Sequence, residues 1–316
     1  MPCACHHRID VHHHLFPPSF QSWLGTQDHY LARGPAADWT PMRSIEDMDE
    51  AGIQTAMTSL TAPAFEAMKP AARREATRAG NEFGATMMRD HPGRFGLFAS
   101  LPLPEVDASL AEIAHALDTL GADGIGLLTS YAGKWLGDPA FAPVLDELNR
   151  RRAVVYVHPT APDCCVNLIP GVQNWVVEFP VDTTRTLASL IFSGTVRRCP
   201  DIRFIFAHCG GVLPLLADHF ERMLAVTPDG ARLLPQGLPA ALRQFHYDIA
   251  LRAHPVGLSS MLQTVGASRL LFGTDAPLRR SLDTVRGLHG LALDPESVAA
   301  IERGNAVRLL DRFQTD

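Results

Sequence analysis

Four short motifs, far apart in the sequence, carry side chains that could bind a metal ion and move protons. They are DVHHH (10–14), VHP (157–159), AHCGG (207–211) and FGTD (272–275). Imidazole nitrogens and carboxylate oxygens are the usual ligands of catalytic zinc and of similar ions. Histidine and aspartate are also the commonest general acids and bases in enzymes. The four motifs together predict a metal-dependent enzyme.

The spacing within the first motif carries geometric information. Successive side chains of a β-strand point to opposite faces, so His12 and His14 share one face and His13 points the other way. A strand with this pattern can place two imidazoles on one ion. A solvated, histidine-rich N-terminus is the alternative for this motif taken alone.

The motifs require strands that end in one place. Apolar, β-branched runs predict strands at 8–13, 54–60, 95–100, 125–128, 154–157, 203–206, 245–249 and 270–272. Helices are predicted between and after them, at 44–51, 70–89, 106–120, 139–151, 183–198, 212–224, 255–264, 282–290 and 295–313.

Eight strands alternating with helices predict an α/β protein whose single domain, residues 1–316, is a (β/α)8 TIM barrel with additional C-terminal helices. In such barrels the active site lies where the strands end. Residues 15–43, an insertion after the first strand, are long for a loop and are expected to cover the barrel mouth as a lid. A doubly wound sheet is the main rival, but no Gly-x-Gly-x-x-Gly follows the first strand.

Composition narrows the class of partner. The chain has 46% hydrophobic and 20% charged residues and a formal net charge of −6, which is typical of a globular protein and argues against binding nucleic acid. No apolar stretch reaches the roughly 20 residues of a membrane span. The first residues lack an apolar signal region, so a cytoplasmic location is expected.

The motifs as a set, with GNA (304–306), resemble the amidohydrolase superfamily over nearly the whole chain. More narrowly they resemble the branch of aminocarboxymuconate semialdehyde decarboxylase, and residues 126–139 look most like 6-methylsalicylate-type decarboxylases. The resemblance implies that His12, His14, His158 and Asp275 bind the metal and that His208 is an acid/base. Strand four ends without the lysine that bridges two ions in other superfamily members. One divalent ion is therefore expected, zinc in the first place and manganese as the alternative.

The resemblance also indicates where the substrate binds and where this chain departs from the branch. Muconate-type members bind substrate carboxylates with an arginine on the helix after strand six, where this chain has His219. Arg33 is a loose counterpart of a second such arginine. Ser130, Tyr131 and Trp175 are further candidates for substrate contact. The missing arginine favours a hydroxybenzoate over a dicarboxylate.

The sequence therefore predicts non-oxidative decarboxylation of a salicylate-like or 6-methylsalicylate-like acid. The metal would chelate a carboxylate oxygen and the phenol oxygen, and Asp275, or His208 through it, would protonate the ring carbon. Hydrolysis of a lactone or amide by metal-bound hydroxide, with Asp275 as base, is the alternative, and a non-catalytic metal-binding barrel is a third. The expected partners are a small aromatic carboxylate and a second copy of the chain in a homodimer.

Overall fold

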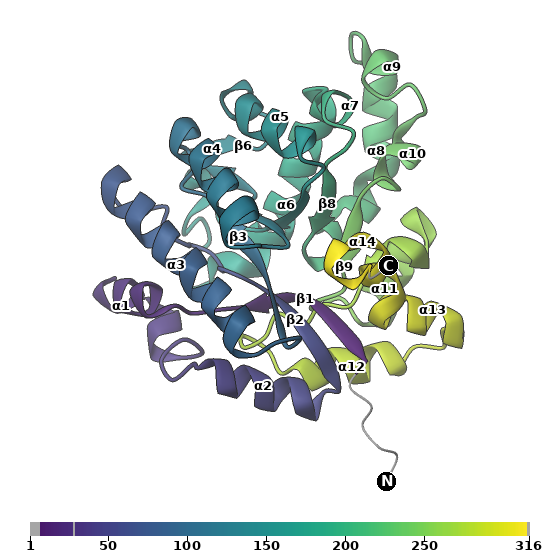
Figure 1. Ribbon diagram of the computed structural model, residues 1–316. Coiled ribbons are helices and arrows are strands. Elements are labelled where there is room, and N and C mark those ends of the chain that lie inside the picture. Colours follow the sequence, from purple (N-terminus) through teal and green to yellow (C-terminus); the bar gives the residue numbers. More distant parts are fainter. Residues whose placement is uncertain (1–6, 28, 315–316) are drawn as a thin grey trace.

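Eight parallel strands form the centre of the protein in the computed structural model, which describes residues 7–27 and 29–314 (Figure 1). In hydrogen-bonded order they are β1 (Arg8–His14), β2 (Ile53–Ser59), β3 (Phe95–Ser100), β4 (Gly124–Leu128), β7 (Val154–His158), β8 (Arg203–Phe206), β9 (His246–Asp248) and β10 (Leu270–Leu271). The amide of Val11 donates to the Phe272 carbonyl, and that of His14 donates to the Ala276 carbonyl. These bonds join the first strand to the segment of the last and close the barrel.

Helices surround the strands, as Figure 1 shows. The longer ones are α2 (Pro41–Glu50), α3 (Pro70–Asp90), α4 (Val106–Ala114), α5 (Ala142–Arg150), α6 (Asn174–Phe192), α8 (Leu213–Val226), α11 (Pro255–Val265) and α12 (Ser281–His289). Shorter pieces are α1 (Pro18–Thr26), α7 (Thr195–Arg198), α9 (Gly230–Leu233), α10 (Leu238–Leu242), α13 (Pro295–Ala299), α14 (Asn305–Leu309) and the hairpin of β5 (Ser130–Tyr131) and β6 (Lys134–Trp135). The predicted TIM barrel is confirmed.

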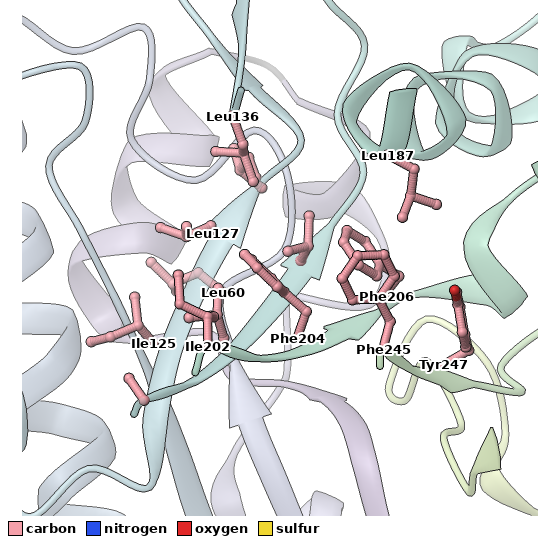
Figure 2. Packing of buried hydrophobic residues seen from close by; sticks show 14 of the residues in the cluster. Leu60, Ile125, Leu127, Leu136, Leu187, Ile202, Phe204, Phe206, Phe245 and Tyr247 are labelled. Atoms are coloured by element: carbon pink, nitrogen blue, oxygen red, sulfur yellow. The ribbon is translucent and has the colours of Figure 1, made fainter. Parts of the chain in front are cut away.

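Alternation along the strands divides the buried side chains into two layers. In β8, Phe204 and Phe206 pack outward with Phe245 against the helices (Figure 2). Ile205, between them, belongs to the cluster inside the barrel. Burial of each such side chain stabilises the fold by about 1.5–3 kcal/mol. In β7 the inward residues include Tyr156, so His158, two positions later, also faces the inside of the barrel end.

A β-bulge in the first strand changes which residues face inward. Ile9 and Val11 pack inside the barrel, so simple alternation would also turn His13 inward. The pairing with β2 shifts register between Asp10 and His13, and His12 and His14 face the site instead. A bulge re-aims the side chains that follow it, and here it lets one strand serve both the core and the site.

Some element boundaries differ from the sequence-based expectations. Helix α6 begins at Asn174, not at 183, because Pro180 lies inside the helix instead of before it. That helix ends at Phe192, and Gly194 separates it from α7 with a φ of 76°. Helix α2 begins at Pro41, three residues earlier than expected, because Thr40 caps it.

The insertion and the C-terminal region also differ in detail. Residues 15–43, expected to be a loop, contain helix α1 and a short 3-10 helix (Tyr30–Arg33). The expected C-terminal helix at 295–313 is divided into α13, a π-helical turn, α14 and a 3-10 turn. Among the residues described, no helix combines the length and the apolar character that crossing a membrane requires.

Candidate metal centre and active site

Three histidines and one aspartate converge at the C-terminal ends of the strands. The Nε2 atoms of His12 and His14 lie 3.2 Å apart, and Asp275 Oδ1 lies 3.2 Å from the first and 3.0 Å from the second. With His158, each of these residues offers a ligand atom within 4.8 Å of the others. All four residues are buried, with at most 5% of the residue surface exposed. The structure thus brings together the four ligands that the resemblance implied.

The hydrogen bonds around the cluster orient the histidines for metal binding. Each histidine has an acceptor beside its Nδ1 atom: the Asp248 carboxylate at 2.9 Å from His12, the Ser59 carbonyl at 3.3 Å from His14, and the Pro159 carbonyl at 2.8 Å from His158. An imidazole that donates through Nδ1 keeps its lone pair on Nε2. Three lone pairs and one carboxylate oxygen therefore face one point, a donor set that fits a zinc-like divalent ion with an open position.

The pKa values of the cluster follow from burial and neighbouring charge. Burial, with the nearby His14 and His12, lowers the pKa of His158 well below its usual value, so this imidazole is neutral. Burial would raise the pKa of Asp275, but hydrogen bonds from His12 and His14 hold it well below the ordinary value. Burial would also lower the pKa of His12, yet Asp248 outweighs it and raises this pKa to about 10. Binding a metal ion would displace that proton.

His208 lies on the same barrel rim in an unusual backbone conformation. His208, Cys209 and Asp275 have φ values of 54°, 55° and 66°, in the left-handed region that side-chain-bearing residues rarely adopt. The His208 amide donates to Asp248 Oδ1 at 3.0 Å, which holds the turn in place. Its Nε2 lies 3.9 Å from Asp275 Oδ2 and has no hydrogen-bond partner among the described atoms. Strained residues of this kind cluster at active sites.

A cavity of about 460 Å³ opens above the cluster, with His158, His208 and Asp275 in its lining. Its outer wall includes Tyr30, Trp175, Phe179, Arg252, Leu278 and Arg279. The rings of Tyr30 and Trp175 face each other with centroids 4.4 Å apart. The volume lies within the range of about 300–1,000 Å³ that is usual for small-molecule sites.

The structure separates the other residues that the sequence suggested for the substrate site. Trp175 lines the cavity. Ser130 is buried, and its hydroxyl donates to the Asp182 carboxylate at 3.3 Å. The Tyr131 hydroxyl accepts from the Leu128 amide at 2.7 Å. Tyr131 lines a smaller hollow next to His158. Arg33 and His219 are exposed and are not in the cavity lining, so the geometry does not support them as substrate contacts.

Sequence reasoning missed residues that act through tertiary contacts. Tyr30, Phe179 and Arg252 line the cavity without belonging to any of the motifs used to locate the site. Asp248, which bonds both His12 and the His208 amide, stands at the end of β9. Its position at a strand end is the signal that could have identified it.

The chain belongs to the amidohydrolase family, because that family's model matches residues 9–312. It is 36% identical to the decarboxylase yanB of Aspergillus niger over 97% of this chain and 88% of that protein. It is 32% identical to a 6-methylsalicylic acid decarboxylase of Penicillium expansum, over 97% of both chains. The family resemblance seen in the motifs is thereby confirmed.

A solved structure agrees with this assignment. The crystal structure of an amidohydrolase II protein superposes with a TM-score of 0.88, at 25% identity, over 96% of this chain and 99% of that one. The names of the relatives agree with the decarboxylase predicted from the motifs.

Proposed function

We propose that this protein is a metal-dependent, non-oxidative decarboxylase of a hydroxy-aromatic acid of the salicylate or 6-methylsalicylate type. The observation that carries the proposal is that His158 and Asp275, two of the four candidate metal ligands, line the same cavity as His208. The relatives that match nearly the whole chain and are named decarboxylases support the reaction type.

One divalent ion is proposed, held by His12, His14, His158 and Asp275. Three imidazole nitrogens suit zinc best, whereas carboxylate and substrate oxygens also suit manganese. When bound, the ion supplies Lewis-acid stabilisation of negative charge on the substrate oxygens. Elemental analysis should find one tightly held ion per chain, and two would contradict the proposal.

The protein's own residues then have to deliver one proton. The ring carbon that bears the carboxylate accepts a proton, the bond to the carboxylate breaks, its electron pair returns to the ring, and CO2 leaves. Asp275 Oδ1 is bonded by the two histidines of β1, so Oδ2, on the side of His208, is the oxygen through which a proton held by His208 can pass. His208 can hold that proton at Nε2, because this atom has no hydrogen-bond partner among the described residues.

The wall of the cavity fits a single aromatic ring. Phe179 packs edge-on against His158, with ring centroids 6.0 Å apart, and Trp175 stands against Tyr30. Aromatic walls favour offset or edge contacts with another ring. The buried residues of the metal-ligand cluster limit the access of water to the reacting carbon. The proposed substrate is therefore a one-ring hydroxybenzoate.

Product analysis in D2O tests this function directly. With 6-methylsalicylate or salicylate, the enzyme should release CO2 and leave one deuterium on the carbon that carried the carboxylate. Efficient hydrolysis of a lactone, with no CO2 from any hydroxybenzoate, would instead establish the hydrolase alternative.

A cytoplasmic homodimer is also proposed. Apolar side chains on the segment before and within α6 are exposed, among them Leu168 (58%), Ile169 (47%) and Val177 (38%), which line one shallow hollow. Contiguous exposed apolar side chains are typical of protein interfaces. Light scattering of the purified chain would measure the assembly, and a monomer at micromolar concentration would contradict it.

A further inference from the structure

Arg252 has an unsatisfied donor in the wall of the active-site cavity. Its side chain is half-buried, and its Nε atom is nearly inaccessible to solvent and has no hydrogen-bond partner among the described atoms. Most buried polar atoms in proteins have a partner, so an exception calls for an explanation. The same side chain lines the cavity that His208 and Asp275 line. A ligand in this cavity could supply the missing acceptor.

The backbone holds Arg252 in this position. The Asp248 carboxylate accepts from the Ala250 amide at 3.0 Å, and the Arg252 amide donates to the Ile249 carbonyl at 2.9 Å. Between them Leu251 adopts a φ of 57°, a conformation that is costly for a residue with a side chain. Leu251 itself is 48% exposed. The turn after β9 is thus fixed to the metal centre through Asp248, which also bonds His12.

The charges around the cavity favour an anion. Two guanidinium groups, Arg252 and Arg279, stand in the described lining, against one carboxylate, Asp275. That carboxylate already faces His12, His14 and His208. Arg279 is exposed, so water screens its charge, whereas Arg252 is half-buried and its charge is screened less.

We infer that Arg252 recognises the carboxylate group of the substrate by donating charge-assisted hydrogen bonds to it. The inference rests on the proposed function for the ligand class, an aromatic monocarboxylate. A guanidinium offers a planar fork of donors that matches a carboxylate, and bonds of this kind are about twice as strong as neutral ones. With this inference, an arginine in the loop after β9 takes the role that the family resemblance led us to expect of an arginine on α8, the helix after β8.

This role has a kinetic signature. The carboxylate leaves as neutral CO2, so a group that binds it stabilises the substrate and not the developing charge of the ring. Loss of Arg252 should therefore raise KM more than it lowers kcat. The phenol product has no carboxylate, so its binding should not depend on Arg252.

Calorimetry on the purified full-length protein can test the inference with a matched pair of non-reacting ligands, benzoate and benzamide. They have the same shape, but only benzoate is charged. Arg252→Met should weaken benzoate binding about tenfold, the effect of losing one hydrogen bond to a charged group, and should leave benzamide within about twofold. Arg252→Lys, which keeps the charge but loses the fork, should fall between. Arg243→Met, an exposed arginine outside the cavity lining, controls for net charge and should leave both affinities unchanged.

The outcomes separate the two proposals. Unchanged benzoate affinity in Arg252→Met, or an equal loss for benzoate and benzamide, would overturn the role of Arg252, whether or not CO2 is produced. Benzoate binding that depends on Arg252 in a protein that releases no CO2 would retain this inference and reject the decarboxylase.

Discussion

The floor and the outer wall of the cavity are built by different means. The floor is the metal-ligand cluster of His12, His14, His158 and Asp275, of which His158 and Asp275 reach the cavity lining. These residues stand at strand ends, are at most 5% exposed, and are held by hydrogen bonds to Asp248, Ser59 and Pro159. The wall comes from the insertion after β1, from α6 and from the loop after β9, and it is partly open to solvent. The residues at the strand ends determine which reaction is catalysed, whereas changes in the loops can alter which substrate binds without altering the metal site.

Replacement of His12 by alanine should give the largest effect, because it removes a ligand and leaves Asp248 without its imidazole partner. Elemental analysis and CO2 release should show metal and activity lost together. The neighbouring His13 is the matched control, since it bonds Asp10 and Ser44 on the other side of the strand. His13→Ala should keep its metal and lose about 1–3 kcal/mol of stability from the unpaired groups. Full metal and activity in His12→Ala would remove it from the ligand set.

His208→Ala should come next, and it distinguishes proton transfer from metal binding within the floor. The variant should retain most of its metal and lose roughly 10²-fold or more in turnover, the usual scale of general acid–base catalysis. Its side chain lies 3.9 Å from Asp275 Oδ2, outside the group of four ligand atoms. If metal content fell as far as in His12→Ala, His208 would be a ligand.

Trp175→Ala should have a smaller effect, confined to the wall. Loss of the aromatic face opposite Tyr30 should raise KM about three- to tenfold, as expected for one aromatic contact, and leave metal content unchanged. Steady-state kinetics on the hydroxybenzoate would measure this, with Trp175→Phe expected to recover most of the loss. A fall in kcat without a change in KM would mean that the wall takes part in the chemistry.

Glu66 should have the smallest effect on activity, because its influence is on the stability of the fold. It lines the small hollow behind His158, where burial and the nearby Asp163 raise its pKa from 4.5 to about 8. Because the folded-state value exceeds the unfolded one, the folded protein holds this proton more tightly, and its stability falls as the pH rises from about 4.5 to about 8.

Glu66→Gln removes that titration. Its free energy of unfolding should match that of the wild type near pH 4.5 and exceed it above pH 8 by an amount on the order of a few kcal/mol, so its thermal midpoint should be higher only at the higher pH. Scanning calorimetry at the two pH values would show this. An equal difference at both would mean that Glu66 is not the group responsible.

The floor could be predicted from the sequence because local rules determine it. A strand has a side-chain period of two, and the ends of parallel strands in a barrel meet on one face, so His12, His14, His158 and Asp275 could be placed together. The bulge in β1 could not be foreseen, since it depends on the pairing with β2. The expectation for His12 and His14 nevertheless held because they remain two residues apart.

The wall could not be predicted in the same way. Arg252 reaches the cavity through the strained turn at Leu251, which Asp248 supports from another strand end. A helix was predicted to begin at 183, yet α6 begins at Asn174 and brings Trp175 to the cavity. Both depend on contacts between segments that are distant in the sequence.

The closure of the barrel has a consequence for how the protein is made. His14 and Asp275 stand 261 positions apart and touch across the junction of the first and last strands, 3.0 Å from each other. A ribosome releases the N-terminal end first, so the nascent chain carries all three ligand histidines long before it has the aspartate. The complete metal site can assemble only after nearly all of the chain has emerged. We therefore expect a C-terminally truncated product that ends before Asp275 to lack a complete metal site and to be inactive.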